Sequence, residues 1–390
     1  MTRPLYAAAS ALAKPTTEHW HKGLWYERFV DIYQVNGSEW RIPKPNENGA
    51  GRSKNDWIET VTGKTGNDAE LKRHASALLQ RTQSLGGVTG GFKSDWHFAT
   101  GLGNPHPVEN GFLWHPTLGV PYLPGSSVKG LVRAWVEHWD DSLSAEDKQA
   151  RCQTWFGTEA KKDVPEHTGQ LIFFDALPTS PVMLAQDVMT PHYGKWYEQG
   201  ADVTNLAREP QKIPADWHDP VPVPFLVVKS ASWLFAIAPR SPAHAEDAQQ
   251  AMQALQQALA WLGAGAKTAV GYGRMEKNDS ELTRLEALRQ QEREKQAAER
   301  HRAQQSPLER KMDEVIQRPV YNGLTPYKAL IQAMEKGEWQ GDEKRQVAAH
   351  IKSLMQQEKG QWKETSGAKK PEKDNEYQRT LKVMKWLNEA

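Results

Sequence analysis

The chain has 390 residues, 25% of them charged, and a formal net charge of +1, so any nucleic-acid binding must depend on local patches or on a larger assembly. Its single cysteine, Cys152, excludes an internal disulfide framework and a cysteine-based zinc site. Because no apolar stretch is long enough to span a bilayer and residues 1–14 lack a signal-peptide core, we expect a cytoplasmic protein with no membrane partner.

The first hundred or so residues show an irregular, mixed pattern. Helical spacing appears near His21–Tyr33 and again near Ala69–Ser84, and the polar stretch Lys44–Lys54 between them predicts an exposed loop. Residues Trp96–Tyr122 are rich in aromatic residues, glycine and proline, which favours strands and turns over helix.

The strongest helix pattern runs from Ser126 to Trp139. Ser126 follows Pro-Gly, which predicts an N-cap, and apolar residues then recur at helical spacing. Ser126, Ser127 and Lys129 would combine free N–H groups, two hydroxyls and an ammonium, a set suited to phosphate; Arg133 lies one turn beyond Lys129 on the same side. An ordinary capped helix with a solvated lysine is the alternative interpretation.

Apolar runs at residues 170–176, 224–229 and 233–238 predict strands, the last two as a pair. A second helix is expected at Ala243–Leu262, and residues 269–275 are expected to finish the sheet, which makes the fold class α+β. After Glu276 the composition becomes strongly charged and then amphipathic. We therefore expect three parts: a domain at 1–278 with an irregular N-terminal insertion, a charged linker helix at 279–305 and an all-helical C-terminal module at 306–390.

Gly263–Gly273, between the second helix and the last strand, contains two Gly-x-Gly pairs. Glycine accepts positive φ and carries no Cβ, so such a loop lets backbone N–H groups approach a bulky anion. Lys267 inside the loop and Arg274 at its exit add positive charge. A glycine-rich turn between helix and strand, with no ligand, is the alternative interpretation.

The spacing in this loop does not fit a nucleotide cofactor. Ala266 precedes Lys267 where a Walker A loop needs glycine, and Thr268 stands where the third glycine of a Rossmann fingerprint belongs. We therefore expect no cofactor. No zinc-helix, nucleophile-elbow or Asp-x-Asp pattern is present, so we assign no catalytic residue and no metal.

His192, in the segment Pro-His-Tyr-Gly, lies between turn-forming residues. It has the chemistry to stack on a base or to hydrogen-bond a ribose. The alternative is a loop histidine that satisfies neighbouring backbone groups.

Four motifs occur in a characteristic order: Gly101-Leu-Gly-Asn-Pro, then Gly119 to Gly130, then Asp187 to Gly194, then Gly263 to Gly273. In this order they resemble the RAMP superfamily, the CRISPR-associated RNA-binding subunits, and most of all the sixth RAMP subunit of the type III-B (Cmr) effector complex. The resemblance covers about His21 to Met275. The tail after Glu276 is not found in the usual, shorter family member.

This resemblance implies a ferredoxin-like (RRM-like) βαββαβ core with long insertions. It also implies a non-catalytic structural subunit for antiviral defence at the crRNA 3′ end of the complex's backbone, with target-RNA cleavage left to a neighbouring subunit. Its partners would be crRNA, target RNA and other RAMP subunits, with no small-molecule substrate. The expected RNA-binding set is Ser126, Ser127, Lys129, Arg133, His192, Gly263, Gly265, Lys267, Thr268, Gly271, Tyr272, Gly273 and Arg274.

Two other functions remain open. One is a metal-independent RAMP endoribonuclease that processes CRISPR precursor RNA, with His192, Tyr193 and Lys267 positioning the ribose 2′-hydroxyl. The other is a helical docking module for a partner protein in the tail, whose tryptophans Trp339, Trp362 and Trp386 suit either a partner surface or the tail's own core.

Overall fold

The computed structural model describes residues 20–37, 39–42, 53–158, 166–205, 207–215, 217–366 and 370–388. Most of the expected exposed loop at Lys44–Lys54 therefore lies outside the described residues. The chain divides into two compact units, Met1–Arg289 and Gln290–Ala390. Among the described residues, no helix combines the length and apolar character needed to cross a membrane.

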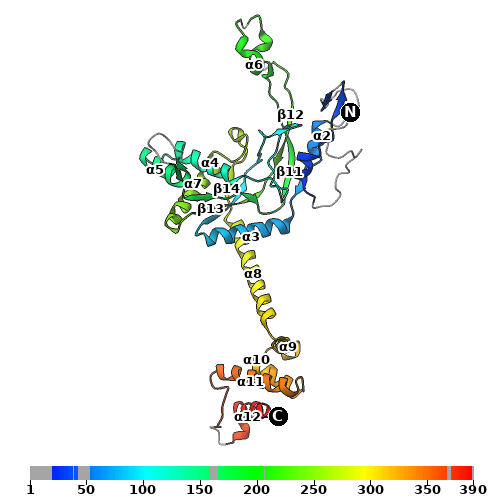
Figure 1. Ribbon diagram of the computed structural model, residues 1–390, viewed down its shortest axis with the longest axis vertical. Coiled ribbons are helices and arrows are strands. Elements are labelled where there is room, and N and C mark those ends of the chain that lie inside the picture. Colours follow the sequence, from blue (N-terminus) through cyan, green and yellow to red (C-terminus); the bar gives the residue numbers. More distant parts are fainter. Residues whose placement is uncertain are drawn as a thin grey trace. The chain divides into compact units, whose positions relative to one another are not determined.

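The first unit is built around a five-stranded antiparallel sheet (Figure 1). Its central strands are β4 (Val88–Ser94) and β13 (Ser232–Pro239), which run antiparallel. β14 (Met275–Lys277) pairs with the outer side of β4. β9 (Leu171–Phe173) and β10 (Leu177–Pro178) follow one another along the opposite side of β13. The sheet order is thus β14, β4, β13 and then β9 with β10.

Both faces of this sheet are covered, which explains why β13 is an almost continuous apolar run. Side chains alternate between faces along a strand. Trp233, Phe235 and Ile237 belong to the core that includes α4 (Gly125–His138) and α7 (Ala245–Trp261). Leu234 and Ala236 pack instead with α3 (Asp68–Ser84). The three long helices predicted from apolar spacing are confirmed and hold the sheet between them.

A second, three-stranded antiparallel sheet has the order β12 (Val223–Val228), β11 (Val182–Met189), β3 (Gly63–Thr65). The expected pairing of residues 224–229 with 233–238 is wrong, because β12 pairs with β11 while β13 joins the main sheet. Between β11 and β12 the chain forms an arm that contains α6 (Gly194–Gln199) and two 3₁₀ turns, Gly200–Asp202 and Pro210–Lys212.

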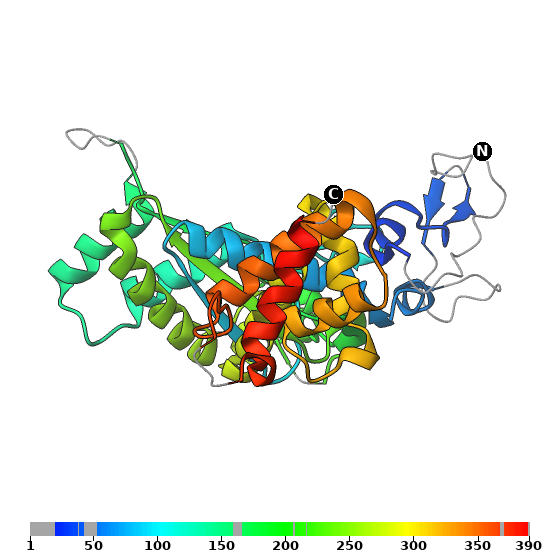
Figure 2. The same ribbon diagram turned by 90° about the horizontal axis from the view of Figure 1, so that it is seen from below.

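Shorter elements surround the two sheets, and Figure 2 shows the β1–β2 ribbon and α5 at opposite ends of the first unit. These elements are α1 (Lys22–Arg28), β1 (Gln34–Asn36), β2 (Glu39–Arg41), α2 (Lys54–Glu59), β5 (Pro105–His106), β6 (Glu109–Asn110), α5 (Ala145–Phe156), β7 (Gly157–Thr158), β8 (His167–Thr168) and the 3₁₀ turns Pro242–His244 and Thr268–Val270.

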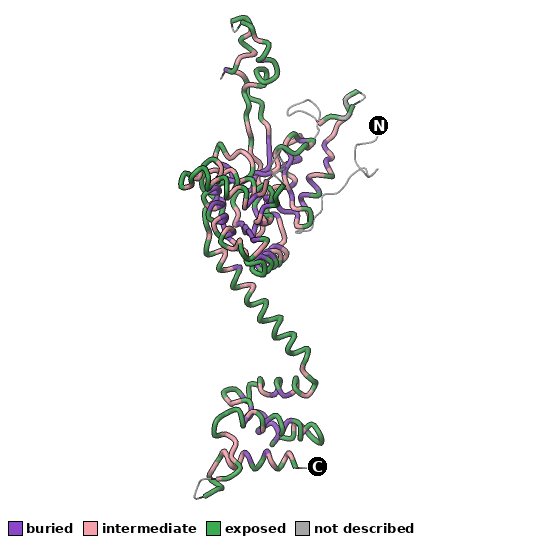
Figure 3. Tube along the Cα trace, turned by 60° about the vertical axis from the view of Figure 1, so that its left-hand side comes forward, coloured by how far each residue is buried: buried purple, intermediate pink, exposed green. Residues whose placement is uncertain are grey.

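The second unit contains only helices among its described residues. Its elements are the end of α8 (Asp279–Gln304), α9 (Pro307–Ile316), α10 (Pro326–Glu335), α11 (Gly341–Gln357), α12 (Asn375–Asn388) and the 3₁₀ turns Pro319–Tyr321 and Pro371–Lys373. Only Leu285 is buried along α8, as the exposed colouring in Figure 3 shows. The other helices share a core around Tyr327 and Trp339.

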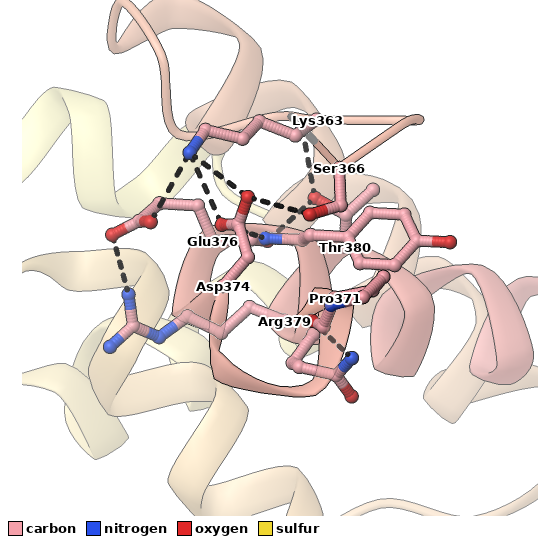
Figure 4. A network of polar contacts seen from close by, with 9 residues as sticks. Lys363, Ser366, Pro371, Asp374, Glu376, Arg379 and Thr380 are labelled. Carbon is pink, nitrogen blue, oxygen red and sulfur yellow. Dashed lines mark hydrogen bonds and ion pairs between the residues drawn. The ribbon is translucent and has the colours of Figure 1, made fainter. Parts of the chain in front are cut away.

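A polar network ties the segment after α11 to α12 (Figure 4). Lys363 Nζ donates to Asp374 Oδ1 at 3.2 Å and to Glu376 Oε2 at 3.4 Å, and its backbone N–H donates to Thr380 Oγ1. The Tyr377 backbone N–H, followed by Lys363 and Ser366, lowers the pKa of Asp374 despite partial desolvation. Part of the expected polar linker at 363–374 is therefore anchored to the unit's last helix.

Candidate nucleic-acid interface

The Gly263–Gly273 loop connects α7 to β14, and three of its glycines are required by its own packing. Gly263, Gly265 and Gly273 have φ values of 75°, 87° and 71°. A Cβ on Gly273 would lie 1.8 Å from Ala264 O, and one on Gly265 would lie 2.2 Å from Ala99 O. The turn interpretation therefore explains these three positions without a ligand.

The loop is also closed by backbone hydrogen bonds. The Ala264 N–H donates to Gly273 O at 2.9 Å, and the Ala266 N–H donates to Ala99 O at 2.8 Å. Gly271, with φ 98°, differs because a Cβ there would meet no atom within 4 Å. The open part of the loop is therefore the short 3₁₀ turn Thr268–Val270 with its flanking residues.

Lys267 and Arg274 are the cations of this loop. Lys267 adopts a left-handed backbone conformation, φ 59°, and its Nζ lies 5.2 Å from the centre of the Phe225 ring. The Arg274 side chain is exposed, and its carbonyl accepts the Asp95 N–H at 2.9 Å. Among the described residues neither side chain forms an ion pair, so both charges remain available to an anion.

A groove of about 560 Å³ runs beside the loop. Its lining includes residues of three of the motifs seen in the sequence, namely 101–104, Leu123 with Ser127, and 263–266 with Thr268. Thr100, Leu113, Leu131 and Leu262 complete it. The remaining motif joins them through Asp187, which accepts a hydrogen bond from Tyr272 in the glycine loop. The fold thus brings all four motifs to one place.

The start of α4 differs from the prediction, because Ser126 is not the N-cap. The helix begins at Gly125 after Pro124, and no side chain caps it locally. Asp175, which follows β9, accepts the Gly125 N–H at 2.6 Å instead. Ser126 and Ser127 are exposed within the first turn. The Asp175 carboxylate therefore already supplies negative charge where the phosphate was expected.

The two basic residues of α4 are engaged within the protein. Lys129 Nζ donates to Phe156 O at 3.0 Å, at the end of α5, and Arg133 Nε donates to Glu137 at 2.8 Å. The groove lining includes Ser127 but neither of these cations.

His192 lies at the start of the arm between β11 and β12. Its Nδ1 is 3.0 Å from His218 O, in the segment of that arm that leads back to β12. This geometry matches a loop histidine that satisfies backbone, and the groove lining does not include it.

Tyr272, a residue of the expected RNA-binding set, belongs to a cluster of aromatic rings beside the loop. The other members, Trp96, His97 and Phe225, were not predicted as site residues. The Tyr272 hydroxyl lies 2.5 Å from Asp187 Oδ2, and His97 Nδ1 lies 3.3 Å from the same oxygen. Burial opposes ionisation of Asp187, yet hydrogen bonds from Tyr272, the Val188 N–H and His97 outweigh it and lower its pKa.

The pKa of the Tyr272 hydroxyl shifts in the opposite direction to that of Asp187. Burial, together with the neighbouring Asp187 carboxylate, raises the pKa of Tyr272. The tyrosine therefore stays a protonated donor and the aspartate an ionised acceptor. Elsewhere in the described residues, no group of three or more His, Cys, Asp or Glu side chains is arranged to hold a metal ion.

The chain is similar to several known proteins. Residues 92–276 match the model of the RAMP superfamily. The chain is 28% identical over 254 residues to the CRISPR system Cmr subunit Cmr6 of Pyrococcus furiosus, covering 52% of this chain and 72% of that protein. It is 28% identical over 183 residues to the CRISPR system CMR subunit Cmr6 of Saccharolobus solfataricus, covering 46% and 51%.

Two solved structures were also matched. A cryo-EM structure of the Type III-B Cmr-beta bound to cognate target RNA has a TM-score of 0.43 and 21% identity, covering 58% of this chain and 71% of that one. The crystal structure of Cmr6 from Pyrococcus furiosus has a TM-score of 0.28 and 25% identity, covering 49% and 97%.

Proposed function

We propose that this chain, a RAMP-superfamily protein over residues 92–276 that resembles the Cmr6 subunits of type III-B CRISPR complexes, is a non-catalytic, RNA-binding structural subunit of such a complex. In this proposal it lies at the crRNA 3′ end of the backbone, contacts guide or target RNA and binds neighbouring RAMP subunits. The observation that carries the proposal is that three of the motifs line one groove and the fourth is hydrogen-bonded to the glycine loop beside it, which carries Lys267 and leads to Arg274.

The chemistry of the groove suits an RNA backbone. Its lining combines small and polar residues with five leucines, and Lys267 lies inside the adjacent loop and Arg274 at its exit. Contacts to phosphate and sugar carry no sequence information, which fits a guide of arbitrary sequence. Of the residues expected from the sequence to bind RNA, we therefore retain those of the glycine loop and Ser127 in this proposal. Lys129, Arg133 and His192 are left out of it.

We also propose a ferredoxin-like core for the first unit. Along the chain, β4, α4, β9 with β10, β13, α7 and β14 follow the order βαββαβ. The sheet order β14, β4, β13, then β9 with β10, with every pairing antiparallel, supports this assignment.

For the domain boundaries we propose 1–278, 279–305 and 306–390. Leu282 contacts the α3 face of the main sheet and Leu285 is buried in the same cluster. A truncation intended to remove the helical module should therefore end after Arg289 and not at Glu276, so that this cluster is retained.

The direct test is to incubate the purified chain with end-labelled single-stranded RNA and measure both binding and cleavage. We expect saturable binding that weakens as salt is added. In a plot of the logarithm of the binding constant against the logarithm of salt concentration, each phosphate contact should contribute about 0.7 to the downward slope. We expect no cleavage with chelator present. Specific metal-independent cleavage of precursor RNA would replace this proposal with the endoribonuclease, and salt-insensitive or absent binding would overturn it.

A further inference from the structure

Trp96 is an exposed tryptophan held in place by other rings. It is 48% exposed and lies two residues after the end of β4. Its ring is stacked on His97, with centroids 4.7 Å apart and an interplanar angle of 14°, and it lies 4.9 Å from the Tyr272 ring. Among the exposed tryptophans of the described chain, Trp96 contacts two aromatic rings, whereas Trp217 contacts one.

The rings beneath Trp96 are fixed by a charged acceptor. Asp187 binds both the Tyr272 hydroxyl and His97 Nδ1, and its other oxygen accepts the Val188 N–H at 2.8 Å. A side chain whose supporting partners are hydrogen-bonded in this way loses less conformational entropy when a ligand binds. The arrangement therefore offers a preorganised aromatic surface.

A cation lies at the other end of the same cluster. Tyr272 is 6.1 Å from the Phe225 ring, and Lys267 Nζ lies over Phe225. One continuous set of rings thus connects an exposed indole to an unpaired ammonium at the glycine loop. An exposed aromatic face and a cation on one cluster are the two features that a single-stranded RNA requires, the face for a base and the cation for a phosphate.

We propose that Trp96 is a stacking platform for one unpaired RNA base, with a phosphate of the same strand directed toward Lys267. This proposal rests on the proposed function and specifies its ligand as single-stranded RNA at this site. Stacking accepts any base because every base has an aromatic face. The platform therefore adds affinity without sequence selectivity.

The test compares Trp96→Ala and Trp96→Leu with wild type in fluorescence-anisotropy titrations against a short single-stranded RNA at several salt concentrations. We expect both variants to bind about tenfold more weakly, because leucine restores apolar bulk but no aromatic face. The slope of affinity against salt should stay unchanged, since loss of stacking releases no counterion. Trp96→Phe should retain most of the affinity.

Trp139→Ala is the matched control, because Trp139 is 57% exposed at the end of α4 and is not part of the ring cluster. We expect it to bind as wild type does. Wild-type affinity in Trp96→Leu would overturn the stacking platform, while the proposed function would stand if Lys267→Gln still weakened binding. Absence of RNA binding by the wild-type chain would overturn both.

Discussion

Gly273→Ala is expected to destabilise the first unit by about 3 kcal/mol or more. Gly273 has φ 71°, and an added Cβ would lie 1.8 Å from Ala264 O, a backbone atom that moves only with the loop. Ala264 is itself held against Gly273, because its N–H donates to Gly273 O. Denaturant unfolding followed by tryptophan fluorescence measures the loss.

Gly271→Ala is the matched control for that substitution. Gly271 also has positive φ, 98°, but a Cβ there would meet no atom within 4 Å. Only the conformational cost remains, about 1–2 kcal/mol. Equal losses in the two variants would contradict the closed loop described above, because only Gly273 is tightly packed.

Replacing both cations of the glycine loop, Lys267→Gln with Arg274→Gln, is expected to weaken RNA binding about 25-fold at roughly 0.1 M salt. Each lost phosphate contact reduces the steepness of the plot of log binding constant against log salt concentration by about 0.7. The double variant should therefore reduce it by about 1.4. Lys267 directly precedes the open 3₁₀ turn of the loop and Arg274 is exposed at the loop's exit, and among the described residues neither forms an ion pair. Titrations across a salt series measure affinity and slope together.

The control pair is Lys129→Gln with Arg133→Gln, which removes the same charge from α4. Lys129 Nζ already donates to Phe156 O, and Arg133 already pairs with Glu137. We therefore expect affinity and slope close to those of wild type. A larger loss in this pair than in the loop pair would show that the RNA follows α4 and not the glycine loop.

Much of the fold could be predicted because it depends on local periodicity. The apolar spacing of α3, α4 and α7 and the apolar run of β13 each carry their signal within a single segment. The order of the four motifs likewise indicated the superfamily that residues 92–276 match.

The features that could not be predicted depend on contacts between distant residues. The Gly125 N–H donates to Asp175, which lies 50 residues away in the sequence. Capping preferences consider only neighbouring residues, and they therefore predicted Ser126 as the N-cap. The pairing of β12 with β11 follows from the tertiary fold and not from the neighbouring strand in sequence. Single segments carry no signal for such pairings.

The cluster of Trp96, His97, Phe225 and Tyr272 could not be predicted for the same reason, because it depends on contacts between residues far apart in the sequence. Asp187 lies 90 residues from His97 and 85 from Tyr272, so nothing in the sequence connects them. The run Trp96-His97-Phe98 was visible only as an aromatic-rich segment. The fixed positions of His97 and Tyr272 beside Trp96 depend on hydrogen bonds that form only in the folded chain.

The most direct test of the RNA-contact proposal is photo-crosslinking of RNA to the chain in its purified native assembly, with the crosslinked residues identified by mass spectrometry. We expect crosslinks in residues 96–104 and 263–274, the segments that supply Trp96, the groove and the glycine loop. Crosslinks confined to the arm or to the second unit, or RNA-containing assemblies without any crosslink to this chain, would contradict the account.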